Sequence, residues 1–420
     1  MSDLKLTPSQ RMAVERSGSS ILVSAAAGSG KTRVLVERLM KRVCEDGTNN
    51  IDDYLIITYT NAAAAELRGK ILEAIYDRIA LDPENRRLRR QADICGRAEI
   101  STIHGFCAGI IRENAHKLGL NPNFRIADDT EARLIKDETI AELIEERYSS
   151  GDSSFLALAD TLGAGRDDSK LISVVFDTHE KLLSHPYPEK WAEKKKRELF
   201  GEGFSDLAET DWGREIIGKV RRWTQYAIKR LEELVDVADS EEAFDKGYGK
   251  SIRKNYDDVK SLSNALDGTW NQIRAALSFD YKRPSGVKGG GFEREIAVRN
   301  AVKAGHERLL ELMWADSEKA LSDLRKTAPS VSALLDLVIE FDRRYLEAKR
   351  KRGVLDFSDQ EHFALKLLAD RETGEPTELA RQISLRYAEI LVDEYQDVNE
   401  IQETIFSAVS RGGKNIFMVG

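Results

Sequence analysis

Residues 25–32 read Ala25-Ala26-Ala27-Gly28-Ser29-Gly30-Lys31-Thr32, and this stretch decides the fold of the chain. Its spacing matches a phosphate-binding P-loop, except that Ala25 stands where the general pattern has glycine. A P-loop needs small residues whose backbone N–H groups can surround phosphate oxygens, and Gly28-Ser29-Gly30 supplies them. Lys31 can then reach the β and γ phosphates of a nucleotide, and the Thr32 hydroxyl can bind Mg²⁺. The stretch therefore predicts a nucleotide site.

The residues around the loop give it the context that the motif requires. An apolar run at 21–24 predicts a buried strand before the loop, and a helix-forming segment runs from Thr32 to about Arg42. A second buried strand is predicted at 54–58, again followed by a helical pattern. Strands that alternate with helices predict a parallel sheet covered on both faces. For the loop taken alone, an ordinary strand–turn–helix connection remains the alternative.

Asp393 and Glu394 predict the second half of the nucleotide site. They end another predicted buried strand, at 389–393. A carboxylate at the end of a strand beside the P-loop can hold Mg²⁺, so Asp393 is the expected metal ligand. Glu394 can orient and deprotonate the attacking water. Taken alone, the pair also fits a solvated acidic turn. The long separation from the P-loop predicts that the intervening block is inserted within one nucleotide-binding core.

The middle of the chain has a different pattern. Strand signals nearly vanish at 128–350, and the apolar residues of 140–148 form one helical stripe. A heptad-like spacing over 334–348 predicts a long packed helix. We therefore predict an α/β core formed by residues 1–127 and 351–420, with an all-helical accessory domain at 128–350. A further strand, predicted at 415–419, reaches the last residue, so we expect an N-terminal fragment of a longer protein.

Composition excludes several classes of protein. A chain of 420 residues is long for one ordinary domain, and 41% hydrophobic with 32% charged residues indicates a folded protein. No apolar stretch approaches the roughly 18 residues of a membrane span, so no membrane partner is expected. Three cysteines without CxxC spacing exclude a disulfide scaffold and favour a cytoplasmic location. The net charge of −8 disfavours a general basic coat but leaves a local nucleic-acid groove open.

Taken together, the motifs resemble those of superfamily 1 DNA helicases of the UvrD/Rep/RecB type. Residues 6–10 are similar to the Q motif, 58–67 to motif Ia, 101–107 to the next DNA-contacting motif, and 392–397 to motif II. The resemblance implies a RecA-like P-loop NTPase core that uses ATP and Mg²⁺. It also implies that Gln10 pairs with the adenine edge and that Arg33 contacts the nucleotide.

Within that group the chain is most similar to the AddA family, which belongs to the bacterial AddAB helicase–nucleases. The likeness lies in residues 61–64, 124–131, 184–191 and 355–362. It implies an ATP-dependent helicase motor in double-strand break repair and recombination, which binds single- and double-stranded DNA. It also implies a heterodimer with an AddB-like nuclease partner and, for the full-length protein, an exonuclease activity.

Three alternatives remain open at this point. One is a UvrD/PcrA-like repair helicase without a nuclease, and another is a nucleotide-switched DNA-binding module without turnover. The third is a P-loop kinase for a small molecule. We expect residues 1–420 alone to bind nucleotide and DNA weakly without DNA-stimulated turnover, because arginine fingers come from a second domain in this class.

The expected DNA contacts lie in loops that follow strands of the core, where hydroxyl and amide groups can bond phosphates. They are Thr60, Asn61, His104 and Phe106. Phe106 can instead fill the core, which is the default for an aromatic side chain. The expected catalytic residues are Lys31, Asp393 and Glu394, and the metal ligands are Thr32 and Asp393. The expected ATP-binding residues are Gln10, Ala25, Ala26, Ala27, Gly28, Ser29, Gly30, Lys31, Thr32 and Arg33.

Overall fold

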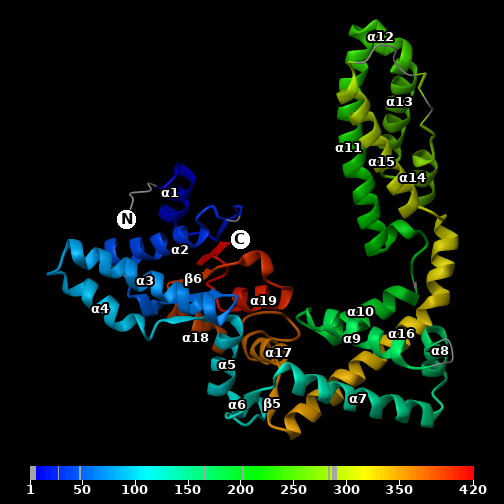
Figure 1. Ribbon diagram of the computed structural model, residues 1–420. Coiled ribbons are helices and arrows are strands. Elements are labelled where there is room, and N and C mark those ends of the chain that lie inside the picture. The colour runs from blue at the N-terminus through cyan, green and yellow to red at the C-terminus, as the bar shows by residue number, and fades with distance from the viewer. Residues whose placement is uncertain are drawn as a thin grey trace. The chain divides into compact units, whose positions relative to one another are not determined.

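The chain forms two compact units, one of Met1–Ala192 with Leu334–Gly420 and one of Glu193–Ala333 (Figure 1). The computed structural model describes residues 6–26, 28–46, 49–163, 167–200, 203–281, 284–285 and 291–420. Ala27 of the predicted P-loop lies outside the described residues. Among the described residues, no helix combines the length and the apolar character that crossing a membrane would need.

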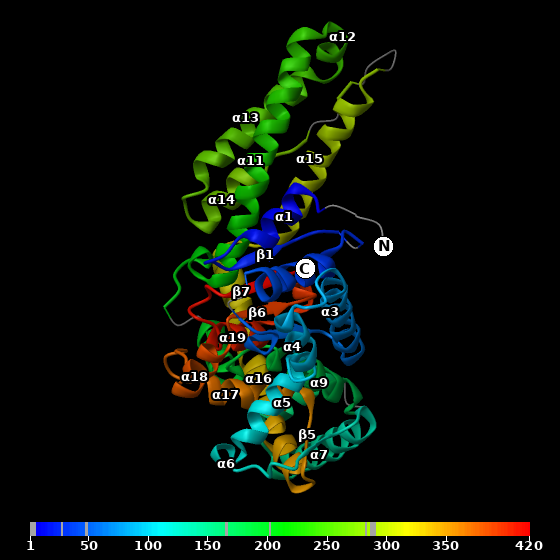
Figure 2. The same ribbon diagram turned by 90° about the vertical axis from the view of Figure 1, so that its left-hand side faces the viewer.

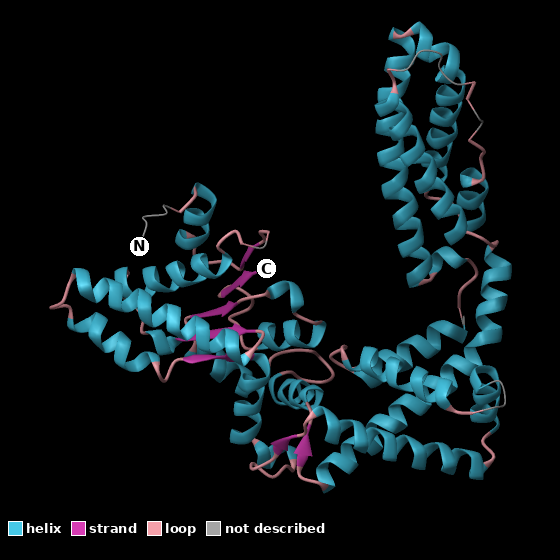
Figure 3. Cartoon of the chain, viewed as in Figure 1, coloured by secondary structure: helices cyan, strands magenta, loops and turns pink. Residues whose placement is uncertain are grey.

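The first unit contains a five-stranded sheet in which every pairing is parallel (Figure 3). Figure 2 views part of this sheet, with β1, β7 and β6 in succession. The strands that the sequence predicted at 21–24, 54–58, 389–393 and 415–419 are confirmed. A further strand was not predicted, because it is short and only alternate residues are buried. In sheet order the strands are β1 Ile21–Val23, β7 Ile416–Val419, β6 Glu389–Val392, β2 Tyr54–Thr58 and β3 Glu99–Thr102.

Side chains of the strands alternate between two apolar cores, as the pleat of a sheet requires. Leu55 and Ile57 of β2 face one core, while Tyr54 and Ile56 face the other. Helices cover both faces, which the sequence predicted. The second of these cores contains residues of α1 Pro8–Glu15, α2 Lys31–Met40 with its π-helical extension Lys41–Glu45, the 3-10 turn Ile51–Asp53, α3 Asn61–Leu81 and α4 Arg86–Cys95. The first contains residues of α5 Ile103–Glu113, α6 Ala115–Leu118, α17 Phe357–Leu368, α18 Glu378–Arg386, the 3-10 turn Tyr395–Asp397 and α19 Glu400–Ala408.

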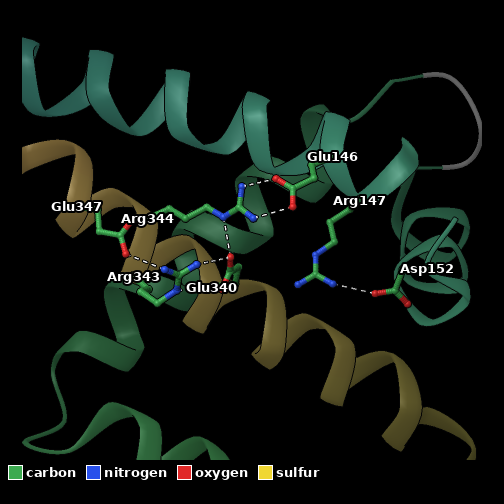
Figure 4. Close-up of polar contacts among 7 residues, drawn as sticks. All are labelled: Glu146, Arg147, Asp152, Glu340, Arg343, Arg344 and Glu347. Atoms are coloured by element: carbon green, nitrogen blue, oxygen red, sulfur yellow. Dashed lines mark hydrogen bonds and ion pairs between the residues drawn. The ribbon is translucent and has the colours of Figure 1, made fainter. Parts of the chain in front are cut away.

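The rest of the first unit is helical except for one small sheet. Its two strands, β4 Arg125–Ile126 and β5 Val354–Leu355, pair in parallel. Arg344 joins two of the helices by donating to Glu146 at 2.6 Å and to Glu340 at 2.6 Å (Figure 4). The helices of this part of the unit are α7 Asp129–Ser150, α8 Ser153–Gly163, α9 Ser169–Leu183, the start of α10 Pro188–Phe200 and the end of α16 Ser317–Lys351. The two that Arg344 joins are α7 and α16.

Helices are the only regular secondary structure among the described residues of the second unit. Its apolar clusters are built from its own helices, with Trp270 and Phe244 among the fully buried side chains. The accessory domain predicted at 128–350 stays a prediction. The second compact unit, Glu193–Ala333, lies within that range and has different bounds. The elements are the 3-10 turn Leu207–Glu209, α11 Asp211–Ser240, α12 Glu242–Phe244, the π-turn Asp245–Gly249, α13 Lys250–Ala265, α14 Trp270–Leu277, α15 Glu293–Leu312 and the start of α16.

Candidate nucleotide and nucleic-acid site

The predicted P-loop joins the end of β1 to the start of α2. Gly28 and Gly30 have φ angles of +77° and +85°, in the left-handed region that glycine adopts without strain. Gly30 is the N-cap of α2, so the first turn of that helix directs backbone N–H groups into the loop. The N–H of Ala25 donates to the carbonyl of Gly420 at 3.1 Å, which ties the loop to the end of β7. This geometry suits an anion.

Thr32 and Asp393 bring the two halves of the predicted site together. The Thr32 hydroxyl donates to Asp393 Oδ2 at 3.3 Å, although the residues are 361 positions apart. Burial raises the pKa of the Asp393 carboxyl, and the neighbouring charge of Glu394 adds to the increase. A half-buried carboxylate beside a hydroxyl supplies two oxygen donors, the ligand type that a hard divalent cation prefers. The arrangement therefore fits Mg²⁺ held between Thr32 and Asp393.

Glu394 has a strained backbone. Its φ of +54° makes it the one non-glycine residue with positive φ in the part of the chain that the structure describes. A residue in this region costs of order 1–3 kcal/mol, and such strain clusters at functional sites. The Gln396 amide donates to the Glu394 carboxylate, and the Glu394 N–H donates to Asp393 Oδ1 at 3.1 Å. The turn thus holds two carboxylates side by side after β6.

Gln10 connects the first helix to the P-loop. Its Nε2 donates to the carbonyl of Ser29 at 3.0 Å, and its Oε1 accepts from the N–H of Thr7 at 2.9 Å. The second bond belongs to a capping box that begins α1. Gln10 therefore lies beside the phosphate loop, as an adenine contact would. Arg33 lies on the first turn of α2.

Arg38 fixes the position of α1, a role that was not predicted from the sequence. Its guanidinium is fully buried and pairs with Glu389 at the start of β6, with Nε at 2.9 Å from Oε2. It also donates to the carbonyls of Ala13 at 2.7 Å and Arg16 at 2.8 Å, at the end of α1. A buried arginine needs several acceptors to offset its desolvation. One side chain thereby joins the P-loop helix, the helix of Gln10 and the strand of Asp393.

The loop after β2 contains the first two predicted DNA contacts. Thr60 caps α3, because its hydroxyl accepts from the N–H of Ala63 at 3.1 Å, and Asn61 is exposed at the first position of that helix. The preceding Tyr59 is 59% exposed, and it was not among the predicted DNA contacts. Thr58 is in register with Thr102, so this loop and the start of α5, which follows β3 directly, lie at the same edge of the sheet.

The other two predicted contacts lie on the first turn of α5, which follows β3 directly, and their surroundings differ. Phe106 is only 5% exposed and packs against Tyr387, with ring centroids 6.5 Å apart. Its ring cannot stack on a base while it lies in the core, so the predicted DNA contact is corrected to core packing, the alternative that the sequence had left open. His104 is half-buried, and its ring lies 4.8 Å from that of Phe357, which is 54% exposed. Phe357 was missed as a single residue, although the segment 355–362 had been noted.

Comparison with known proteins agrees with these features. The family model described as the UvrD/REP helicase N-terminal domain matches residues 6–420. Similar proteins include the ATP-dependent helicase/nuclease A subunit of Clostridium beijerinckii, 34% identical over 440 residues that cover 100% of this chain and 35% of that protein. The protein of the same name from Geobacillus thermodenitrificans is 37% identical over 430 residues, which cover 99% of this chain and 34% of that protein. The chain thus spans about a third of the length of the curated relatives it matches.

Proposed function

The chain belongs to the UvrD/REP helicase family, and from this membership we propose that it is the ATP- and single-stranded-DNA-binding part of an ATP-dependent DNA helicase. The observation that carries the proposal is the hydrogen bond between Thr32 and Asp393. It joins a P-loop to a strand-end carboxylate, and this pairing serves phosphoryl transfer in P-loop NTPases. ATP hydrolysis would drive movement along single-stranded DNA and unwinding ahead of it.

We assign roles to the residues of the nucleotide site. The backbone of 25–30 and the ammonium of Lys31 would hold the phosphates, with Arg33 as a further contact. Gln10 would read adenine with the second N–H of its amide nitrogen and the second lone pair of its amide oxygen, because each atom makes one hydrogen bond at present. Thr32 and Asp393 would hold Mg²⁺, which when bound supplies positive charge beside the phosphates. Glu394 would act as the general base, oriented by its strained turn and by Gln396.

The DNA site is proposed at the edge of the sheet where β2 and β3 end. Thr60, Asn61 and His104 would bond phosphates or sugars. Two exposed aromatic side chains, Tyr59 and Phe357, lie beside them in the loop after β2 and against His104. Such rings are platforms on which single-stranded bases stack, at about 1–3 kcal/mol per base. Their exposure supports single-stranded DNA as the ligand.

For the architecture and the partner we make two further proposals. The first is a RecA-like core of 1–127 and 351–420 with an inserted helical domain at 128–350. It is supported by the absence of strands from the described residues between β4 and β5. The second is that the whole protein acts with an AddB-like nuclease partner in the repair of double-strand breaks. The support is that its relatives are named as one of the subunits of a helicase/nuclease. Co-purification of the two gene products would test the second proposal.

The experiment that tests the function is steady-state phosphate release by the full-length protein, with and without an oligothymidylate, because residues 1–420 alone are expected to show no DNA-stimulated turnover. A helicase motor is expected to hydrolyse ATP faster when single-stranded DNA is present, and Glu394→Gln should abolish the reaction. Binding of ATP and DNA without any hydrolysis would favour a nucleotide-switched binding module instead. A rate of ATP hydrolysis that is unchanged by DNA but increased by a small phosphoryl acceptor would favour a kinase and overturn the proposal.

A further inference from the structure

Glu361 is a buried carboxylate whose hydrogen bonds reach two different parts of the first unit. It is 5% exposed and lies on α17. Its Oε1 is 3.2 Å from His104 Nε2 and accepts from Gln402 Nε2 at 2.5 Å. Its Oε2 accepts from Asn399 Nδ2 at 3.4 Å. One carboxylate therefore bonds a side chain of the proposed DNA edge and two side chains of the segment that follows Glu394.

The carboxylate is stable there only because of these partners. Burial alone would raise the pKa of Glu361, but the hydrogen bonds from His104 and Gln402 outweigh it and the pKa is lowered. Glu361 is therefore an ionised acceptor in the folded protein. Loss of one donor from a buried, charged acceptor is costly, so a change at His104 alters how strongly the other donors are held.

The helix that carries Glu361 contacts the helices on both sides of it that hold the partners of its carboxylate. α17 packs against both α5, which begins with the His104 turn, and α19 (Figure 1). Asn399 is the N-cap of α19, where its side chain accepts from the N–H of Gln402. The strained turn of Glu394 ends at the residue before Asn399. The chain from Glu394 to α19 is thus held at one end by the strand of Asp393 and at the other by the Asn399 and Gln402 bonds to Glu361.

We propose that Glu361 is a positioning residue that couples DNA binding at the His104 edge to the turn that holds Glu394. The inference rests on the proposed function and names the residues through which the DNA site would affect the nucleotide site. His104 would have two alternative partners: Glu361, as in this structure, and a DNA phosphate. With His104 bonded to the phosphate, Glu361 keeps only Asn399 and Gln402, so its bonds to the start of α19 tighten and the Glu394 turn is repositioned. Nucleotide and DNA then affect one another's affinity.

The test is a coupling measurement on the 420-residue protein. The dissociation constant of a fluorescent oligothymidylate is measured without nucleotide and with saturating Mg²⁺ and a non-hydrolysable ATP analogue. Coupling between two sites is typically 5–150-fold and must be reciprocal, so the same factor should appear in nucleotide affinity with and without DNA. For Glu361→Gln the factor should fall to about one, while each ligand alone still binds within about twofold of the unsubstituted protein. A role in folding alone would lower stability without removing the coupling.

Two further variants make the result decisive. Gln402→Met removes one bond to Glu361 at similar volume and should also reduce the factor, and it decides the matter if Glu361→Gln does not fold. Glu340→Gln removes a carboxylate of α16 that accepts from Arg343 and Arg344 in the same unit, and it should leave the factor unchanged (Figure 4). If Glu361→Gln and Gln402→Met both keep the full factor, the proposal is wrong. If the unsubstituted protein binds both ligands without any coupling, the proposal is also wrong although the proposed function stands. If it binds neither ligand, both fail.

Discussion

The Lys31 ammonium and the Glu394 carboxylate serve different steps in the proposed reaction, and this difference can be measured. Lys31→Ala should weaken binding of Mg²⁺ and ATP by about 10- to 100-fold, because a hydrogen bond to a charged group contributes about 1.5–3 kcal/mol. Glu394→Gln should leave nucleotide affinity nearly unchanged, since a general base acts only in the chemical step. Fluorescence titration with a labelled ATP analogue measures both. Equal losses in the two variants would contradict the assigned roles.

Asp393 is the proposed Mg²⁺ ligand, but its buried carboxylate should lower the free energy of unfolding of the ligand-free protein. Burial raises the pKa of its carboxyl, so the folded protein binds this proton more tightly than the unfolded chain does. Above the ordinary value of about 3.9, ionisation therefore lowers stability until the raised pKa is passed. Asp393→Asn should make the ligand-free protein more stable at neutral pH, and this gain should vanish near pH 3.

The same variant should lose stabilisation by ligand. A ligand present at a hundred times its dissociation constant adds about 2.7 kcal/mol, so Mg²⁺ with ATP should stabilise the unsubstituted protein by that amount and Asp393→Asn by much less. Thermal denaturation with and without the ligands measures the difference. Asp397→Asn, at an exposed residue of the adjacent 3-10 turn, is the control and should respond like the unsubstituted protein. If Asp393→Asn instead lowers the stability of the ligand-free protein, this account of the site is contradicted.

At the scale of elements, a buried lysine joins the end of α16 to the start of α17. Lys349 Nζ lies 2.7 Å from Asp356 Oδ2, 2.6 Å from Asp359 Oδ2 and 3.9 Å from the centroid of the Tyr345 ring. Burial would raise the pKa of both carboxyls, and it does so for Asp359, while the ion pair with Lys349 outweighs burial and lowers the pKa of Asp356. The two buried carboxyl groups, Asp356 and Asp359, thus share the Lys349 ammonium as their ion-pair partner.

Removal of that ammonium should be strongly destabilising. Lys349→Met should lower the free energy of unfolding by about 3–5 kcal/mol, because it leaves buried charge without a partner. The loss should shrink on acidification, when protonation neutralises the carboxylates, and in the double variant with Asp359→Asn. Lys351→Met, two residues on and exposed, should change stability by no more than about 0.5 kcal/mol. Urea denaturation at neutral and mildly acidic pH measures all three, and a Lys349→Met protein as stable as Lys351→Met would refute the argument.

Elements with a local signal could be predicted from the sequence. Four strands and the long helix through Phe341 and Tyr345 follow from apolar runs and heptad spacing, and the structure confirms them. The P-loop was predicted from its motif spacing, and its role as a nucleotide site stays a prediction. Phe106 was ambiguous, because an aromatic residue in a strand-end motif can serve the core or a ligand, and only packing decides. Glu361 and Arg38 could not be predicted, since their partners come from distant segments that meet only in the folded chain.

At the scale of the whole molecule, the second compact unit carries its own apolar interior. Val220, Leu262 and Trp270 pack in one cluster, and Leu231, Phe244 and Val302 in another, with every member of both clusters inside Glu193–Ala333. Trp270 donates its indole N–H to the carbonyl of Ala315 at 3.0 Å, and the Ser317 hydroxyl accepts from the N–H of Leu207 at 2.8 Å. Among the described residues of this unit, the buried Asn255 amide and the buried Tyr281 hydroxyl have no hydrogen-bond partner. The apolar clusters are nevertheless complete within the segment, which is the main condition for independent folding.

We therefore expect residues 193–333, expressed alone, to form a monomeric helical domain with one cooperative thermal transition. Circular dichroism gives the helix content and the transition, and near-ultraviolet signals from buried Trp270 report fixed packing. Trp270→Ala should cost about 3–5 kcal/mol, because it leaves a large cavity in the cluster. Trp314→Ala, at a residue that is largely exposed, is the matched control and should cost much less. A helical signal that melts without cooperativity, or equal effects of the two substitutions, would mean that these helices need the rest of the chain to pack. The domain boundary would then lie nearer the predicted 128 and 350.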